Sequence, residues 1–220
     1  YVSYVPQIKI AEPKAIIHNF DLSKTDFSVD WELFSQIVNK KTKAIIINSP
    51  NNPSGKMFTK KDFSQLVKII EKNNCYLLSD EIYEKFIIGD INHISPGSFE
   101  SIKDHVITIN GFSKSFAMTG WRVGYLSANK SIVKNIVKLV QHINTNTVTF
   151  IQKGLCNAYK TNNPGLKKFN HSLRAKVDYM LNTFTNEFSA PNGGIFSFLN
   201  INNTGLDSDE FATQLLSKYN

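Results

Sequence analysis

Short runs of β-branched and aliphatic residues alternate with amphipathic helical segments through the first two thirds of the chain, and this alternation restricts the fold most strongly. Residues 44–48 and 76–80 have the length and composition of buried strands, and further strands are expected over 106–109 and 123–126. Strands joined by crossover helices predict a three-layer α/β/α domain with a mostly parallel sheet. In such a domain, ligands bind beyond the carboxyl ends of the strands.

Two helices are marked clearly among these strands. Thr59 and Asp62 have the spacing of a capping box, and the helix that they open carries an apolar stripe as far as Ile70. A second amphipathic helix begins near Ser131, with aliphatic residues on one side and lysines on the other. Both helices therefore have one face suited to packing against a sheet.

The alternation ends near residue 150, and the rest of the sequence indicates a second, smaller unit. The pattern predicts helices over residues 150–159 and 166–188, an alternating strand over 195–201, and a last helix that begins at Ser208. We therefore expect a large layered domain over residues 1–160 and an incomplete α+β small domain over residues 161–220.

Composition excludes several classes of partner. The chain has 25 Lys and Arg against 18 Asp and Glu, a net charge of +7, but only Arg122 and Arg174 are arginines and the lysines are dispersed, so nucleic-acid binding is not expected. Cys75 and Cys156 are far apart and the histidines lack metal-ligand spacing, so neither a disulfide nor a metal site is expected. No apolar run approaches the ~18 residues of a membrane span, so no membrane partner is expected.

Polar clusters follow three of the predicted strands. The first runs from Asn48 to Gly55, and its prolines and asparagines fix a tight turn whose amide side chains can point into a cleft. The second places Asp80 at the end of an apolar strand, where a carboxylate needs a cation or several hydrogen-bond donors. Taken alone, the first cluster is also explained as a structural turn and the second as a helix cap.

The third cluster runs from Gly111 to Gly124 and contains Lys114 among Gly, Ser, Phe, Ala and Met residues rather than other charges. A lysine held in an apolar pocket loses proton affinity and becomes an amine nucleophile for carbonyl compounds. Arg122 precedes a predicted strand, and its planar guanidinium suits a phosphate group.

Together, the three clusters resemble the signature of the fold-type I pyridoxal 5′-phosphate (PLP) aminotransferases of class I/II, the aspartate aminotransferase family. The resemblance rests on Asn-Asn-Pro-Ser-Gly ending at Gly55, Ser-Asp-Glu-Ile-Tyr ending at Tyr83, and Gly-Phe-Ser-Lys with Met-Thr-Gly-Trp-Arg between Gly111 and Arg122. It extends from the opening Tyr-Val-Ser-Tyr to Pro-Asn-Gly-Gly-Ile-Phe ending at Phe196, which is similar to a strand of the family's small domain.

The resemblance implies roles for four central residues. Lys114 would form the internal aldimine with PLP and, once displaced by substrate, move a proton between the substrate Cα and the cofactor. Asp80 would pair with the pyridine nitrogen. Asn52 and Tyr83 would hydrogen-bond the phenolic oxygen O3′, so that Lys114, Asp80 and Tyr83 form the catalytic set.

The resemblance also assigns the outer contacts and shows where this sequence departs from the family. Arg122 would hold the phosphate, and Tyr1 would stack on the cofactor ring. Gly111 stands where many relatives carry a phosphate-binding serine, so that contact is expected from Ser113. Arg174 lies within a predicted helix, which leaves no arginine for the substrate carboxylate. We therefore expect a fragment that lacks both termini, including the start of the PLP-binding large domain, and that is inactive by itself.

The resemblance implies an aminotransferase that moves an amino group between an aspartate-like or aromatic L-amino acid and a 2-oxo acid. It further implies a cytoplasmic homodimer that acts in amino acid metabolism and biosynthesis. A PLP-dependent carbon-sulfur lyase, or an enzyme like aminocyclopropane-carboxylate synthase, would use the same lysine and aspartate. A ligand-sensing domain of a transcription regulator can be built on the same scaffold. The Ser-x-x-Lys spacings at Ser127 and Ser131 favour a hydrolase only weakly, because lysine is abundant and Ser131 is suited to capping a helix.

Overall fold

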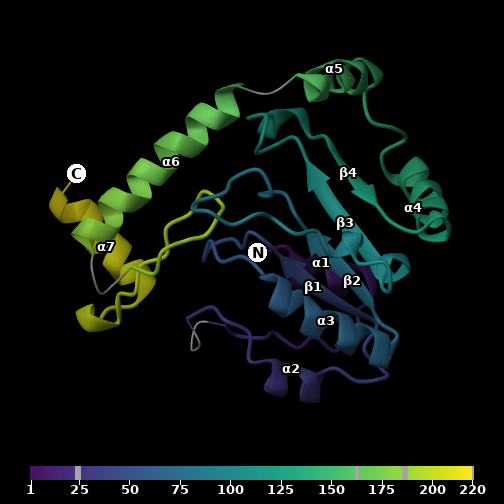
Figure 1. The fold of residues 1–220 in the computed structure, drawn as a ribbon, viewed down its shortest axis with the longest axis horizontal. Helices are drawn as coiled ribbons and strands as arrows, with labels where there is room; N and C mark the ends of the chain where they lie inside the picture. Colours follow the sequence, from purple (N-terminus) through teal and green to yellow (C-terminus); the bar gives the residue numbers. More distant parts are fainter. Residues whose placement is uncertain (23–25, 162–163, 185–187, 220) are drawn as a thin grey trace.

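The computed structural model of the chain describes residues 1–22, 26–161, 164–184 and 188–219, and in this part the chain forms a four-stranded sheet (Figure 1). The strands lie in the order β1 (Ala44–Asn48), β2 (Tyr76–Asp80), β3 (Val106–Gly111) and β4 (Gly124–Ser127). The first three strands are parallel, and β4 is antiparallel to β3. The predicted mostly parallel sheet is confirmed, with β1 and β2 at the expected bounds.

The change of direction at β4 follows from its connection. β1 and β2 are joined through the crossover helix α3 (Lys60–Asn73), as parallel neighbours require. The short connection from β3 to β4 contains the 3₁₀ turn Thr119–Trp121, and the chain returns antiparallel to β3. The other described 3₁₀ turns are Pro96–Ser98, Lys103–His105 and Asn202–Thr204.

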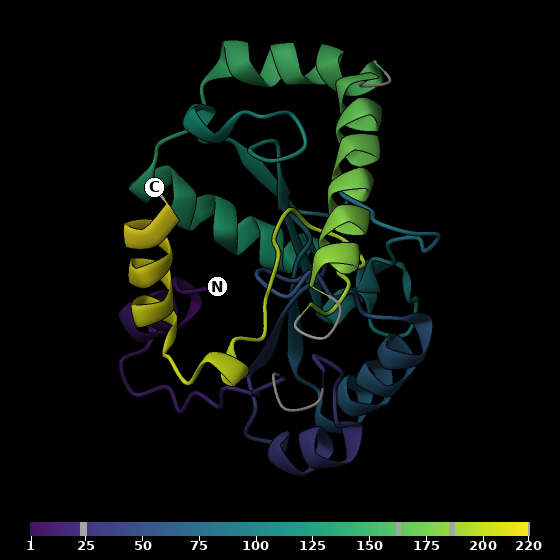
Figure 2. The same cartoon turned by 90° about the vertical axis from the view of Figure 1, so that its left-hand side faces the viewer.

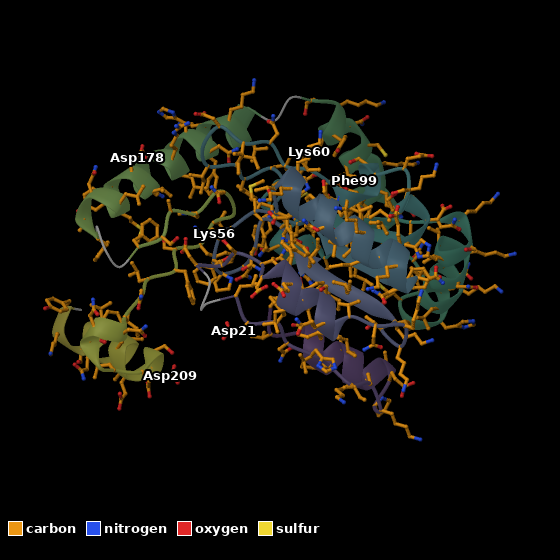
Figure 3. All side chains as sticks on the ribbon, turned by 60° about the horizontal axis from the view of Figure 1, so that its bottom comes forward. Asp21, Lys56, Lys60, Phe99, Asp178 and Asp209 are labelled. Atoms are coloured by element: carbon orange, nitrogen blue, oxygen red, sulfur yellow. The ribbon has the colours of Figure 1, made fainter. Side chains whose placement is uncertain are left out.

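Helix α3 builds the main core against the sheet. The Thr59 side chain accepts from the backbone N–H of Asp62, and the Asp62 carboxylate accepts in return from the backbone N–H of Thr59, which confirms the predicted capping box. Phe63, Leu66 and Ile70 on the inner face are fully buried. Figure 3 shows Lys60 at the start of α3 and Phe99 beside the helix, where the rings of Phe63 and Phe99 pack 5.9 Å apart.

The remaining helices surround this core unevenly. They are α1 (Tyr4–Ala11), α2 (Trp31–Ile37), α4 (Lys130–Ile143), α5 (Thr149–Lys160), α6 (Pro164–Thr183) and α7 (Ser208–Tyr219). Figure 2 shows the sheet nearly edge-on, with α3 on one side and α1 and α4 on the other, which is the expected three-layer arrangement. The sequence pattern assigned no element before residue 44, so α1 and α2 are additions from the structure.

Helix α4 confirms the amphipathic segment near Ser131, yet none of its residues is buried. Val137, Leu139 and Ile143 are each about half exposed or more. Its apolar stripe thus lies open in the part of the chain that the structure describes. None of the helices formed by the described residues combines the length and apolar character that a membrane crossing requires.

The alternating strand predicted over residues 195–201 is wrong for the described residues. Only an isolated bridge between Phe188 and Leu199 occurs in that segment. Alternation of apolar and polar residues describes a half-buried extended segment, but a strand also needs a hydrogen-bonded partner along its length. The predicted helix over 166–188 corresponds to α6, and residues 185–187 of that prediction lie outside the described part. The division into domains at residue 160 stays a prediction.

The turn at Pro191–Gly194 joins the last third of the chain to the loop after β1. The backbone N–H groups of Asn192 and Gly193 both donate to the carbonyl oxygen of Gly55, at 2.8 and 2.9 Å. Gly55 has φ +69°, and a Cβ at this position would lie 2.3 Å from Cβ of Pro191. A glycine is therefore required where these two turns touch.

We expect Gly55→Ala to lower the free energy of unfolding by about 2 kcal/mol or more, because the new methyl group meets Pro191 in a left-handed backbone conformation. Gly154→Ala in α5 is the matched control, since no atom lies within 4 Å of its Cβ position; it should raise stability by up to about 1 kcal/mol. Urea unfolding of both variants checks this. Equal stability of Gly55→Ala and the parent chain would contradict the packing argument.

Candidate active site at the carboxyl ends of the strands

The three polar clusters meet at one edge of the sheet because the strands that precede them are parallel. Asn48 pairs in register with Asp80, and Asp80 with Ile109. The Asn48 side chain donates to the backbone carbonyl of Asp80 at 3.0 Å and accepts from the backbone N–H of Asn52 at 2.7 Å. Asn48 therefore fixes the loop that carries Asn52 against the end of β2.

Asp80 is held in a defined orientation at this edge. It is half-buried, and its Oδ1 accepts from the backbone N–H of Ile82 at 3.2 Å. Its Oδ2 accepts from the hydroxyl of Tyr4 at 2.6 Å. The carboxylate thus accepts hydrogen bonds from donors in two separate segments. These bonds offset the free-energy cost of removing the carboxylate from water.

Tyr83 lies buried beside Asp80. Burial, and then the nearby Asp80 carboxylate, raise the pKa of the Tyr83 hydroxyl, while hydrogen bonding from the Asn52 side chain acts in the lowering direction. The ring of Phe196 meets the Tyr83 ring edge-on, with centroids 5.5 Å apart. Because the net shift is upward, Tyr83 keeps its proton at neutral pH and remains a hydrogen-bond donor.

Lys114 approaches the same group of side chains from the loop after β3. Its Nζ lies 5.9 Å from the centroid of the Tyr83 ring, a distance typical of a cation–π contact. The side chain is half-buried, and neighbouring Phe112 and Phe116 pack their rings 5.4 Å apart. The structure therefore brings Lys114, Tyr83, Asn52 and Asp80 to the same edge of the sheet, and their roles there stay predictions.

Tyr1 joins this group at its margin. The residue is 63% exposed, and its ring packs edge-on against Tyr4 with the centroids 5.5 Å apart. Its hydroxyl also acts electrostatically on Tyr83, which shows that it lies near the site.

Arg122 and Ser113 are less closely connected to the site. Arg122 is exposed, has φ +51° and donates from Nη1 to the carbonyl oxygen of Thr119 at 2.9 Å. Ser113 is half-buried next to Lys114. Among the described residues, no hydrogen bond or ring contact links either of them to Asp80 or Tyr83.

Sequence reasoning missed two side chains at this edge, Tyr4 and Glu81. Tyr4 follows Tyr1 in a segment with no assigned element, and only the fold brings it to Asp80. Glu81 could have been noticed, because residues alternate along a strand, so Glu81 faces away from Asp80. Its carboxylate is fully buried; Ser79 and Ser95 each donate to Oε1 at 2.9 Å.

His93 completes the surroundings of Glu81. Its Nε2 lies 2.9 Å from Oε2 of Glu81, and both side chains are almost fully buried. Glu84 lies close enough that the three residues offer ligand atoms within 4.8 Å of one another. The Glu81 carboxylate already has three partners, however, so the geometry is explained as a hydrogen-bond network beneath the site. Within the described part of the chain, only the buried Nδ1 of His93 in this network has no partner.

These observations define a layered α/β protein with an amine, a carboxylate, an amide and a phenol gathered where parallel strands end. The sequence matches the family described as "Aminotransferase class I and II" over residues 1–220. The chain therefore belongs to the class I and II aminotransferase family.

Individual relatives agree with this assignment. An aspartate aminotransferase of Pyrococcus abyssi is 34% identical over 98% of this chain and 57% of its own length. An aromatic-amino-acid aminotransferase of Thermococcus litoralis is also 34% identical, over 99% of this chain and 57% of its own length. The chain thus spans somewhat more than half the length of the relatives that it matches.

Solved structures show the same arrangement. An aspartate aminotransferase double mutant of Thermus thermophilus superposes with a TM-score of 0.88 and 29% identity, covering 99% of this chain and 57% of that chain. An Escherichia coli protein described with a methionine aminotransferase function superposes with a TM-score of 0.90 and 26% identity, covering 99% of this chain and 58% of that chain. The fold expected from the resemblance is confirmed.

The residues gathered at this edge fit PLP, the cofactor of this family, by the chemistry of their functional groups. The aldehyde group of PLP binds covalently to a primary amine, and Lys114 supplies one. A nearby carboxylate favours the protonated form of the PLP ring nitrogen, and Asp80 supplies that carboxylate. The phenolic oxygen O3′ of PLP requires hydrogen-bonding partners. Asn52 and Tyr83 lie together beside the Asp80 carboxylate and can supply them.

We expect His93→Ala to lower the free energy of unfolding by about 2 kcal/mol, because the buried Glu81 carboxylate loses one of its three partners. His18→Ala is the matched control, since His18 is exposed; its effect should stay within about 0.5 kcal/mol. Chemical unfolding curves of the two variants give the comparison. Similar stabilities for both would show that the His93 contact contributes little.

Proposed function

We propose that the protein to which this chain belongs is a PLP-dependent aminotransferase that acts on an aspartate-like or aromatic L-amino acid and a 2-oxo acid. The observation that carries the proposal is the meeting of Lys114 with Tyr83, Asn52 and Asp80 at the carboxyl ends of the parallel strands. Family membership and relatives described as aspartate and aromatic-amino-acid aminotransferases support the reaction and the substrate class.

Lys114 is proposed to hold the cofactor covalently through Nζ and, once released, to accept and return the proton of the substrate Cα. When bound, the cofactor supplies an electron-withdrawing ring that stabilises the negative charge left at that carbon. The half-buried position of Lys114 and its aromatic neighbours limit water around the amine.

Asp80, Asn52 and Tyr83 are proposed to orient the cofactor ring. Asp80 presents a fixed carboxylate for the ring nitrogen, since both of its oxygens are already hydrogen-bonded within the protein. Tyr83 acts as a donor because its pKa is raised by burial and by Asp80. Asn52 is suited to share the phenolic oxygen with Tyr83, because its loop is fixed by Asn48.

The outer contacts are proposed to come from Arg122, Ser113 and Tyr1. A guanidinium has five N–H donors, so Arg122 can bind a phosphate while it keeps its hydrogen bond to Thr119. Ser113 lies next to Lys114 and offers a hydroxyl for the same phosphate. Tyr1 lies near Tyr83 with an exposed ring that can stack on the cofactor.

The assembly and the location also belong to the proposal. We propose a homodimer that works in the cytoplasm in amino acid biosynthesis, with residues 1–160 in the cofactor-binding domain and 161–220 in the small domain. The family resemblance supports these statements. Sedimentation velocity of the full-length protein tests the dimer, and cell fractionation tests the location.

We expect borohydride reduction of the full-length protein with PLP to attach the cofactor permanently to Lys114, as found by peptide mass spectrometry. Lys114→Ala should abolish this labelling, because Lys114 carries the amine that lies over the Tyr83 ring. Lys153→Ala, which changes an exposed lysine of α5, should label as the parent protein does. Labelling that persists in Lys114→Ala would refute the assignment.

We expect the full-length protein to transfer the amino group of aspartate or an aromatic amino acid to 2-oxoglutarate. Asp80→Ala should lower kcat/KM for this transfer by about a thousandfold, because the ring loses its charged partner. Coupled spectrophotometric assays measure the transfer. Release of pyruvate and sulfide instead would favour a carbon-sulfur lyase, and ligand binding without turnover would favour a sensor domain.

A further inference from the structure

Tyr4 lies at the carboxylate of Asp80 and has no role in the proposed chemistry. Tyr4 begins helix α1, far from β2 in the sequence, yet its hydroxyl donates to Oδ2 of Asp80 at 2.6 Å. A hydrogen bond to a charged acceptor is about twice as strong as one between neutral groups. This contact therefore links α1 directly to the residue that faces the cofactor nitrogen in the proposed function.

We propose that Tyr4 is a positioning residue that fixes the plane of the Asp80 carboxylate for the ring nitrogen of the cofactor. This inference rests on the proposed function. Two donors hold the carboxylate at opposite oxygens: the N–H of Ile82 at Oδ1 and the hydroxyl of Tyr4 at Oδ2. Each carboxylate oxygen has two lone-pair sites, so each keeps one for a further donor.

The surroundings of Tyr4 suit a permanent donor. Burial first, and then the hydrogen bond to Asp80 and its negative charge, raise the pKa of the Tyr4 hydroxyl far above its usual range. The proton therefore stays on Tyr4 at any physiological pH. The Tyr4 ring also packs edge-on against Tyr1 at 5.5 Å, which restricts its rotation.

A positioning role differs measurably from a packing role. Tyr4→Phe keeps the ring and its contact with Tyr1 but removes the hydroxyl. If the hydroxyl orients Asp80, its removal weakens the binding only of ligands that contact the Asp80 carboxylate. If Tyr4 merely packs at the site, the variant either changes nothing or weakens every ligand that enters.

The test measures the binding of two probes to the full-length protein freed of cofactor. PLP has the ring nitrogen, and 1-deazapyridoxal 5′-phosphate has a carbon in its place. We expect Tyr4→Phe to weaken PLP binding by about tenfold and to leave binding of the deaza analogue within about twofold of the parent protein. Equilibrium dialysis gives both dissociation constants without any measurement of activity.

Two further variants complete the design. Tyr179→Phe removes a hydroxyl from an exposed tyrosine of α6 and should change neither dissociation constant. In an Asp80→Ala background, Tyr4→Phe should have no additional effect on PLP binding, because the two residues act through one contact.

Equal weakening of both probes, or unchanged PLP binding in Tyr4→Phe, would overturn the positioning role while leaving the proposed function intact. A parent protein that binds neither probe would overturn the proposed function, and the role of Tyr4 with it. A tenfold loss that is confined to PLP and absent without Asp80 would establish the role.

Discussion

The parallel pairing of β1, β2 and β3 is the constraint on which the rest of the site depends. Strands that run the same way end at the same edge, so residues far apart in the sequence become neighbours there. The carbonyl oxygen of Asp80 shows this directly, because it accepts from the backbone N–H of Ser49 at 3.1 Å and from the Asn48 side chain at 3.0 Å. The end of β2 thus anchors the loop after β1.

The alternation of side chains at the end of β2 separates two kinds of carboxylate. Asp80 faces the site, is half-buried and keeps room for a ligand, whereas Glu81 faces away and is enclosed by Ser79, Ser95 and His93. The enclosed Glu81 carboxylate is fully buried and is held by these three side chains. Two adjacent acidic residues are therefore divided between a buried network and the candidate site.

The sequence predicted those parts of the structure that depend on local patterns. The β-branched run of β1 and the capping box at Thr59 determine their elements within a few residues, and the bounds followed closely. The approach of Lys114 to Tyr83, just after β2, follows the rule that ligand sites lie at the carboxyl ends of parallel strands.

The parts that sequence patterns missed depend on contacts between distant segments. Tyr4 reaches Asp80 only through the packing of α1, and nothing in the residues around Tyr4 marks it as a partner of β2. The failed strand over residues 195–201 has the same cause, since alternation cannot say whether a neighbouring strand is present. The role of Arg122 at the phosphate stays a prediction; in this structure its Nη1 donates to the carbonyl oxygen of Thr119.

The contact between Gly55 and the turn at Pro191–Gly194 has a consequence for the order in which the molecule is built. The loop after β1 is synthesised early. Its Gly55 carbonyl oxygen accepts hydrogen bonds from the backbone N–H groups of Asn192 and Gly193, which are synthesised much later. Contacts between segments so distant along the chain form slowly, because the intervening chain must first be ordered. The loop that carries Asn52 can therefore complete these hydrogen bonds only after Asn192 and Gly193 have been synthesised and have reached Gly55.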